Sequence, residues 1–384
     1  AMRWIMILRS IETIIRMLDA DFIEYKDMTR MVSGVCIDSR KCTQGNLYIP
    51  IIGAHFDGHD FAAQAIEQGA VAVLWQKDHP HPPQGAAVIL VDDTQQALSA
   101  LAKKYRESLD LVMIGITGSN GKTSTKDILC SLLKRKYVTQ KTHGNMNNEI
   151  GVPLTLLGLS DATQVAIVEM GMENRYEINA LTRLVQPDIA VITNVGEAHL
   201  ENLGSIENIA RAKAEIVHGL KENGVLLFNG EQDVLKLALW QEELPRGTTV
   251  KSFGHDERQD LFSYGDVTQD AGGISFHCNL LAQPASMNIY GKHQVMNALP
   301  CIYIARALGM SEAQILEGLA DIEQTGLRCV LVALGAGYVL DDSYKSNRQS
   351  VLAALATLCE FDIPRRIAIL SDMLDMGDQA VHPL

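Results

Sequence analysis

The segment GITGSNGKTSTKDIL, residues 115–129, has glycines, a lysine and hydroxyl side chains in the order typical of a phosphate-binding loop. In the common pattern, G-x-x-x-x-G-K-S/T, backbone N–H groups beside the glycines contact phosphate oxygens. Gly121 and Lys122 fit this pattern, but Ile116 occupies the position of the first glycine. We expect Lys122 to reach the β- and γ-phosphates of a nucleotide and the Thr123 hydroxyl to bind Mg²⁺. The alternative is an ordinary strand–turn–helix connection, in which Gly and Asn suit the turn.

Three further side chains follow apolar runs and could belong to the same site. Glu169 ends the run VAIVE, and a carboxylate at the carboxyl end of a parallel strand lies at the ligand-binding edge of such a sheet. It could hold Mg²⁺ directly or through water, or it could be a solvated charge. His199 follows the next run and would project into the same crevice, although a single loop histidine is more often structural. Lys213 lies on a predicted helix, where its spacing alone favours a surface position.

An asparagine cluster comes after the loop, in the segment NMNNEIGVPLTLL, residues 145–157. Asparagine is a good turn and capping residue, so a structural role is plausible. So many side-chain amides also suit a polar, hydrogen-bonding substrate.

The apolar runs predict a mostly parallel sheet. LVMIGITG precedes the phosphate-binding loop, and an amphipathic helix begins near Lys122. Other short apolar runs, each followed by a helical stretch, occupy residues 164–171, 188–196 and 224–230. Strands that alternate with helices in this way form parallel sheets covered by helices on both faces. Residues 250–290 predict shorter antiparallel strands, and residues 293–309 predict a helix that Pro300 could kink.

The chain length of 384 residues favours two or three domains. We place boundaries that give residues 1–108, 109–326 and 327–384. In the last of these the pattern predicts strands near 329–334 and 337–341, a helix near 348–360 and a strand at 366–372. These elements bury too little for an independent core, so we expect the third domain to be incomplete.

Composition excludes several classes of protein. A formal net charge of -13 argues against broad nucleic-acid binding, which relies on a basic surface. The seven cysteines form no C-x-x-C pair, which is typical of a reduced, cytoplasmic chain without a disulfide framework or zinc site. Charged residues interrupt the apolar N-terminal run, so we expect no membrane insertion.

Together these segments resemble the Mur ligases, the ATP-dependent enzymes that form amide bonds in peptidoglycan synthesis. The phosphate-binding loop of that family is typically G-x-T-G-S/T-N-G-K-S/T, and GITGSNGKT fits it with Gly118 inside the loop. The segments NMNNEIGVPLTLL, ITNVGEAHLENLGSIENIARAKAEI, YGKHQVMNAL and LDDSYKSN add to the resemblance. It implies an α/β fold of three domains, with a central P-loop domain and a C-terminal Rossmann-like domain.

The resemblance also implies the roles of individual residues. The implied ATP-binding residues are Gly118, Ser119, Asn120, Gly121, Lys122, Thr123, Ser124, Asn297, Arg328 and Asp342, with Asn347 beside the last two. The implied catalytic residues are Lys122, Glu169, His199 and Lys213. The implied Mg²⁺ ligands are Thr123, Glu169, His199 and Lys213 as a carbamate. A carbamate supplies anionic oxygen ligands, whereas an ammonium would repel Mg²⁺. Gln294 stands where the family often has Asn, and Arg348 where it usually has Pro.

The implied substrates are UDP-N-acetylmuramoyl-tripeptide and D-alanyl-D-alanine, which a cytoplasmic and monomeric enzyme would join through an acyl phosphate. The segments DSR and GNLYIPIIGAHFDGHDF resemble the domain that holds the UDP end of the substrate. The implied substrate-binding residues are Ser39, Arg40, Asp57, Asn147 and Asn148.

Three alternatives stay open at this point. The preceding Mur ligase, which adds the third amino acid, is disfavoured by NMNNEIGVP. A non-catalytic protein that binds a nucleotide or UDP-sugar is favoured by the ending MGDQAVHPL. A generic P-loop kinase or switch would need a separate Walker B aspartate, and no convincing candidate is found.

Overall fold

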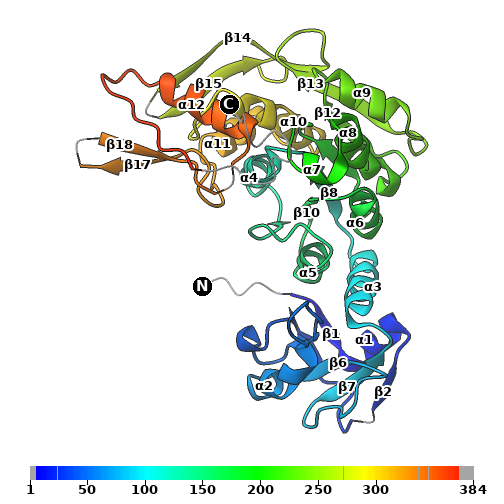
Figure 1. The fold of residues 1–384 in the computed structure, drawn as a ribbon. Coiled ribbons are helices and arrows are strands. Elements are labelled where there is room, and N and C mark those ends of the chain that lie inside the picture. The colour runs from blue at the N-terminus through cyan, green and yellow to red at the C-terminus, as the bar shows by residue number, and fades with distance from the viewer. Residues whose placement is uncertain (1–5, 24, 271, 336, 345, 372–384) are drawn as a thin grey trace. The chain divides into compact units, whose positions relative to one another are not determined.

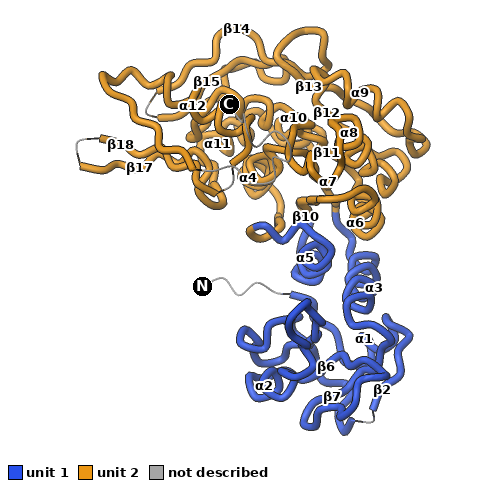
Figure 2. The backbone as a smooth tube through the Cα atoms, viewed as in Figure 1, with its two compact units in different colours: residues 1–111, 145–164 blue, residues 112–144, 165–384 orange. Residues whose placement is uncertain are grey.

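The computed structural model describes residues 6–371, apart from residues 24, 271, 336 and 345. The chain forms two compact units, shown in Figure 2. Unit 1 consists of residues 1–111 and 145–164, and unit 2 consists of residues 112–144 and 165–384. The asparagine cluster at 145–157 therefore belongs to unit 1, although the phosphate-binding loop belongs to unit 2. In the described part of the chain, none of the helices combines the length and apolar character that a membrane crossing requires.

Unit 1 contains a five-stranded sheet in the order β2-β7-β6-β5-β4 and a separate antiparallel pair of β1 and β3. Its strands are β1 (Leu8–Ser10), β2 (Asp21–Ile23), β3 (Met31–Ser33), β4 (Val35–Cys36), β5 (Leu47–Tyr48), β6 (Ala72–Gln76) and β7 (Ala87–Val91). Its helices are α1 (Ile11–Leu18), η1 (Ser39–Lys41), η2 (Gly58–Phe61), α2 (Ala62–Glu67), α3 (Thr94–Glu107) and α5 (Gly151–Leu157). Only β2 runs antiparallel to its neighbour in the larger sheet.

Unit 2 is built on a nine-stranded sheet in the order β16-β15-β14-β13-β12-β11-β8-β10-β9. Several of its strands, among them β8, β10 and β12, are labelled in Figure 1. Its strands are β8 (Val112–Thr117), β9 (Thr139–Lys141), β10 (Val165–Glu169), β11 (Ile189–Ile192), β12 (Val225–Asn229), β13 (Thr249–Gly254), β14 (Leu261–Asp270), β15 (Gly273–Cys278) and β16 (Ala285–Met287). The pairs from β9 to β14 are parallel, whereas β15 and β16 are antiparallel. The predicted mostly parallel sheet and its antiparallel continuation are confirmed.

The central strands of this sheet are apolar runs because both of their faces are buried. Ile114, Ile167 and Val191, from three neighbouring strands, are fully buried in one core. The helices of the unit are α4 (Lys122–Leu133), α6 (Glu177–Val185), α7 (Leu200–Leu203), α8 (Ile206–Ala214), η3 (Glu215–Gly219), α9 (Asp233–Trp240), α10 (Gln294–Ala307), α11 (Glu312–Leu319) and α12 (Arg348–Cys359). Pro300 lies inside α10.

The order of the strands places α4 and α6 on opposite faces of the sheet. The connection through α4 leaves β8 toward β9 and β10, whereas the connection through α6 runs from β10 back across β8 to β11. Right-handed crossovers that run in opposite directions lie on opposite faces. The connections after the neighbouring strands β8 and β11 also diverge, which creates a topological switch point at their carboxyl ends. Ligands of open parallel sheets bind at such a point.

The C-terminal part of unit 2 contains an antiparallel hairpin of β17 (Val330–Leu334) and β18 (Gly337–Asp341), followed by α12. These elements match the predicted strands and helix. The predicted strand at 366–372 is wrong for residues 366–371, which form no strand, and residue 372 lies outside the described residues. An apolar run becomes a strand only where a neighbouring strand pairs with its backbone, and the hairpin pairs only with itself.

Candidate active site

Two glycines shape the phosphate-binding loop between β8 and α4. Gly118 has a φ of 148° and Gly121 a φ of 80°, values that side chains rarely adopt. A Cβ atom at Gly118 would collide with Thr193 Oγ1, and one at Gly121 would collide with the Asn297 side chain. The local geometry therefore requires glycine at these two positions, whereas Ile116 belongs to the buried strand before the loop.

The loop is fastened to the segment that follows β11. Ser119 N donates to Asn194 O, and Asn120 N donates to Asn194 Oδ1, each at 2.9 Å. Gly196 N donates to Ser119 Oγ at 2.8 Å, and the Thr193 hydroxyl donates to Asn120 O at 2.5 Å. The two loops at the switch point are therefore pre-formed as one structure. Sequence reasoning missed Thr193 and Asn194, because polar residues after a strand are common turn formers.

Two lysines lie close enough at this site to affect each other. Lys122 is the first residue of α4, and its Nζ donates to Gly118 O at 2.7 Å and to Ser119 O at 3.3 Å. Lys213, in α8, is buried, so the surface position that its spacing alone favours is wrong. Burial, and after it the charge of Lys122, lowers the pKa of the Lys213 ammonium well below its ordinary value. The environment thus favours a neutral, reactive amine at Lys213.

Glu169 ends β10 inside the protein rather than at a solvated edge. Its Oε2 accepts a 3.0 Å hydrogen bond from Thr123 Oγ1 and lies 3.2 Å from Lys126 Nζ. The Lys126 side chain is fully buried and the Glu169 side chain is 3% exposed. The Thr142 hydroxyl accepts from Glu169 N at 2.9 Å and fixes the end of the strand. Sequence reasoning missed Lys126, because a lysine in a helix is ordinarily a surface residue.

The oxygen atoms of Thr123 and Glu169 form a donor set that fits Mg²⁺. This ion prefers carboxylate and hydroxyl oxygens and keeps several water ligands, so one carboxylate beside the phosphates is enough protein ligation. Ser124 lies in the same first turn of α4, half-buried. The Thr123 and Glu169 oxygens meet because β8 and β10 are paired neighbours, with Glu169 opposite Ile116.

His199 lies in the segment between β11 and α7, beyond the residues that hold the phosphate-binding loop. It immediately precedes α7 and has a φ of 66°. Left-handed backbone is uncommon for a residue with a side chain, and such strain clusters at functional sites. The role of His199 as a metal ligand stays a prediction.

Asn297, in α10, contacts the end of the phosphate-binding loop. Its Oδ1 accepts from Thr125 Oγ1 at 3.4 Å, and its Nδ2 donates to Gln294 Oε1 at 2.8 Å. All three side chains are buried. Gln294, which departs from the family pattern, therefore orients the Asn297 amide. The Asn297 side chain packs so closely against Gly121 that α10 also restricts the conformation of the phosphate-binding loop.

The residues after β18 reach the phosphate-binding loop through side-chain amides. Asn347 Nδ2 donates to Asn120 Oδ1 at 2.7 Å, and Asn120 Nδ2 donates to Gln349 Oε1 at 3.0 Å. Asn347 also begins α12, with its side chain accepting from Ser350 N. Arg348 Nη1 lies 3.9 Å from Glu197 Oε1. Sequence reasoning missed Gln349, since glutamine in a first helical turn is unremarkable.

Arg328 and Asp342 lie beside each other at the base of the β17–β18 hairpin. The Arg328 guanidinium carbon lies 4.4 Å from the centre of the Tyr344 ring. Asp342 Oδ1 accepts from Cys329 N at 3.1 Å. Burial raises the pKa of the Asp342 carboxyl, and the positive charge of Arg328 works in the opposite direction. Their contact with a nucleotide stays a prediction.

In unit 1, the predicted substrate-binding residues take part in local hydrogen bonds. Ser39 Oγ donates to Gln64 Oε1 at 2.6 Å, and Arg40 Nε lies 2.9 Å from Asp38 Oδ1. Asp38 also accepts from Arg40 N and so begins η1. Asp57 accepts from His59 N in the same way at the start of η2.

Asp57, His59 and His79 place three possible metal-ligand atoms within 4.8 Å of one another. The two imidazole rings are stacked, with centroids 4.2 Å apart and planes 9° from parallel. Lone pairs of imidazole nitrogens lie in the ring plane, so stacked rings cannot aim at one ion. His59 instead contacts Asp57 Oδ1 through Nδ1 at 2.6 Å, which orients the carboxylate. The cluster is therefore a hydrogen-bonded support for the segment that contains Asp57 and His59.

Asn148 precedes α5 in unit 1 by three residues. Its Oδ1 accepts from Gly151 N at 2.9 Å, at the first residue of α5. Asn148 therefore has a structural hydrogen bond to the first turn of α5, although the N-cap residue of that helix is Ile150. Substrate contacts of Asn147 and Asn148 stay a prediction.

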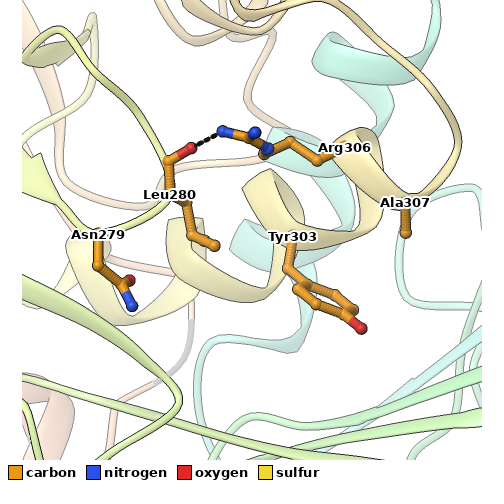
Figure 3. A pocket seen from close by; sticks show the side chains of 5 residues that line it. All are labelled: Asn279, Leu280, Tyr303, Arg306 and Ala307. Carbon is orange, nitrogen blue, oxygen red and sulfur yellow. Dashed lines mark hydrogen bonds between the residues drawn. The ribbon is translucent and has the colours of Figure 1, made fainter.

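A separate pocket of unit 2 lies between the end of β15 and α10 (Figure 3). It is lined by Asn279, Leu280, Tyr303, Arg306 and Ala307. The Arg306 guanidinium is exposed and donates to Leu280 O. The pocket contains none of the residues predicted to bind ATP or Mg²⁺.

Comparison with known proteins decides the family. Residues 116–305 match the Mur ligase middle domain, and residues 31–106 match the catalytic domain of the Mur ligase family. UDP-N-acetylmuramoyl-tripeptide–D-alanyl-D-alanine ligase of Bacillus subtilis (strain 168) is 40% identical over 375 residues, which cover 97% of this chain and 80% of that protein. The chain belongs to the Mur ligase family. The ligase of the same name from Escherichia coli (strain K12) is 32% identical, over 91% of this chain and 76% of that protein.

Solved Mur ligase structures share the fold of this chain. A crystal structure of MurF from Acinetobacter baumannii has a TM-score of 0.84 at 28% identity, and covers 98% of this chain and 81% of that one. MurF ligase from Thermotoga maritima in complex with ADP has a TM-score of 0.79 at 26% identity, over 90% and 79% of the two chains. The expected three-domain Mur ligase architecture and an amide-bond-forming ligase are therefore confirmed for this Mur ligase.

Proposed function

We propose that this Mur ligase uses ATP to join D-alanyl-D-alanine to UDP-N-acetylmuramoyl-tripeptide. The observation that carries the proposal is the meeting of Lys122, Thr123 and Glu169 at the switch point of a sheet shared with MurF structures. The curated relatives named for this reaction match nearly the whole chain. The ADP complex of the Thermotoga maritima ligase supports ATP as the nucleotide.

In the first step, the terminal carboxylate oxygen of the tripeptide attacks the γ-phosphorus of ATP, and the bond to the ADP oxygen breaks. In the second step, the amine of D-alanyl-D-alanine attacks the acyl carbon, loses a proton and expels phosphate. Lys122, freed from the carbonyls of Gly118 and Ser119, would bind the transferred phosphoryl group. Catalysis rests on positioning and charge neutralisation, because the reactants supply the covalent chemistry.

The proposed Mg²⁺ ligands are Thr123, Glu169, His199 and Lys213 as a carbamate. Bound Mg²⁺ would neutralise charge on the phosphate oxygens. Carbon dioxide reacts with the neutral amine, and the lowered pKa of Lys213 favours that form. Burial disfavours the ammonium form, because it removes the charge from water. A carbamate would also attract the ammonium group of Lys122, which repels the ammonium form of Lys213.

We assign residues 1–108 to the UDP end of the substrate, residues 109–326 to ATP, and residues 327–384 to the closing domain, of which 372–384 lie outside the described residues. Ser39, Arg40, Asp57, Asn147 and Asn148 are the proposed substrate contacts. Asn297 would contact the adenine, and Arg328, Asp342 and Asn347 would approach the nucleotide from the closing domain. All seven cysteines are free, which supports a cytoplasmic enzyme.

Phosphate release by the purified chain tests the function. We expect release that requires ATP, Mg²⁺, UDP-N-acetylmuramoyl-tripeptide and D-alanyl-D-alanine together. Release with L-lysine or diaminopimelate and a UDP-N-acetylmuramoyl-dipeptide, but not with D-alanyl-D-alanine, would assign the preceding reaction instead. Calorimetric ATP binding without turnover on either substrate pair would overturn the enzymatic proposal in favour of a binding protein.

A further inference from the structure

Lys126 is a fully buried lysine that the reaction scheme does not use. It lies on α4, and its Nζ is 3.2 Å from Glu169 Oε2. The same Nζ donates to Gly144 O at 3.1 Å. A lysine is almost never fully buried unless it is paired. Because the Lys126 side chain has no exposed surface, its ammonium group stays beside the Glu169 carboxylate instead of turning toward water.

The Oε2 atom of Glu169 is therefore shared by two neighbours. Thr123 Oγ1 donates a hydrogen bond to it at 3.0 Å, and the Lys126 ammonium group lies 3.2 Å away. A carboxylate oxygen has two lone-pair sites for such neighbours. A divalent cation bound to the same oxygen would stand next to the ammonium group, and the two positive charges would repel each other. Glu169 can therefore offer a metal ion at most its other oxygen, Oε1.

The number of carboxylate oxygens that face a metal ion separates Mg²⁺ from Ca²⁺. Ca²⁺ takes more oxygen ligands than Mg²⁺ and often binds both oxygens of one carboxylate. Mg²⁺ is smaller, requires octahedral geometry and keeps several water ligands. A single oxygen of Glu169, together with the Thr123 hydroxyl, meets the needs of Mg²⁺ beside a phosphate but leaves Ca²⁺ with too few ligands.

We propose that Lys126 determines the metal selectivity of the site, because its ammonium group restricts Glu169 to one metal-facing oxygen and so favours Mg²⁺ over Ca²⁺. The proposal rests on the proposed function, in which the metal ion accompanies the nucleotide. Lys126 acts through Glu169 and is therefore a positioning residue. The Thr142 hydroxyl supports this arrangement, because it accepts from Glu169 N at 2.9 Å and fixes the end of β10.

The test measures ADP binding to the full chain with each metal ion. Lys126→Met replaces the ammonium group with an unbranched apolar side chain and removes one of the two neighbours of Glu169 Oε2. Calorimetry gives the Kd of ADP in MgCl₂ and in CaCl₂. Wild-type protein should bind ADP more tightly with Mg²⁺. In Lys126→Met the ratio of the two Kd values should move toward Ca²⁺ by about tenfold, because both carboxylate oxygens become available. Equal affinities in the wild type, or an unchanged ratio in the variant, would overturn the proposal.

Thermal unfolding without nucleotide provides a second measurement. Lys126→Met leaves the buried Glu169 carboxylate without its counter-charge, and a bound divalent cation can take that place. CaCl₂ should therefore raise the melting temperature of Lys126→Met more than MgCl₂ does, and should change that of the wild type little. If this variant is unfolded without metal, circular dichroism follows its refolding as each salt is added. A variant that Ca²⁺ neither stabilises nor refolds would contradict the proposal.

Lys141→Met is the matched control. Lys141 Nζ lies 2.6 Å from Asp127 Oδ1, on the same helix α4, and the Asp127 side chain is 2% exposed. This control also leaves a buried carboxylate without its ammonium partner, but at a position that does not contact Glu169. We expect lower stability with the wild-type ratio of the two Kd values. A ratio that moves equally in both variants would show that lost stability, and not Lys126, sets the metal preference.

The double variant Glu169→Gln/Lys126→Met removes the carboxylate that is proposed to bind Ca²⁺. Its ratio of Kd values should lose the calcium gain of Lys126→Met, and a gain that persists would overturn the proposal. These measurements need only ADP and the metal ion. Absent wild-type turnover with D-alanyl-D-alanine would therefore sink the proposed function, whereas the ratio of Kd values still tests Lys126.

Discussion

Thr123 Oγ1 donates a 3.0 Å hydrogen bond to Glu169 Oε2, which joins the phosphate-binding loop to the neighbouring strand. The same carboxylate oxygen pairs with Lys126, whose side chain is fully buried. Glu169 therefore has two separable tasks: it compensates a buried ammonium, and it offers oxygen ligands beside the phosphate site.

Glu169→Gln should destabilise the protein by about 3–5 kcal/mol, because it leaves the Lys126 ammonium buried without a counter-charge. Turnover should be lost as well. The double variant Glu169→Gln/Lys126→Met removes both charges and should recover most of the stability without recovering turnover. Urea unfolding and phosphate release measure the two effects, and a double variant as unstable as the single one would contradict this division.

Lys122→Ala should abolish ATP-dependent phosphate release, by at least about 10²-fold, because the transferred phosphoryl group loses its cation. The variant also removes the hydrogen bonds from Lys122 Nζ to Gly118 O and Ser119 O, and its melting temperature shows what they contribute to stability. Near-normal turnover in this variant would refute the role of the loop. Loss of the neighbouring charge should also raise the pKa of Lys213, which the pH dependence of carbamylation by bicarbonate would show.

Lys213→Met should abolish turnover but raise stability in bicarbonate-free buffer at neutral pH. The folded pKa of Lys213 is lowered, so the unfolded chain binds a proton that the folded chain does not. Each unit by which the folded pKa is lowered destabilises the folded wild type by about 1.4 kcal/mol. This cost is complete at a pH below the folded pKa and vanishes at a pH above the unfolded pKa of about 10.4. The gain from Met should therefore shrink as pH rises toward 10, and thermal melts across pH check this. A gain independent of pH would contradict a neutral buried amine.

Asn297→Ala should weaken ATP and ADP binding by the same factor, since Asn297 is proposed to contact the adenine that both share. It also removes the partner of the buried Gln294 amide, at a cost of about 1–3 kcal/mol in stability. Calorimetry with ATP and with ADP measures the ratio of the two dissociation constants. Lys122→Ala is the comparison, because it should weaken ATP more than ADP. An altered ratio would contradict a role through the adenine alone, because the Asn297 side chain also packs against Gly121 of the phosphate-binding loop.

The sequence by itself determined the phosphate-binding loop and the sheet that carries it. An apolar run, a Gly-Ser-Asn-Gly-Lys turn and a helix are contiguous, and their conformation depends on local sterics and backbone hydrogen bonding. The alternation of such runs with helices also predicted that β8, β10, β11 and β12 belong to a mostly parallel sheet, whereas their order in it came from the tertiary structure. The family resemblance added Lys213, whose spacing alone pointed to the surface.

Only the tertiary structure decided which side chains meet across long separations. The pairing of Glu169 with Lys126, and of Asp127 with Thr325, joins residues whose types are ordinary in their own segments. Asn347 and Asn120 are 227 positions apart, and no local pattern links them. Burial lowers the pKa of Lys213 in the same way, since desolvation is a property of packed surroundings. The predicted strand at 366–371 failed for the converse reason: an apolar run needs a partner strand, which its own sequence does not supply.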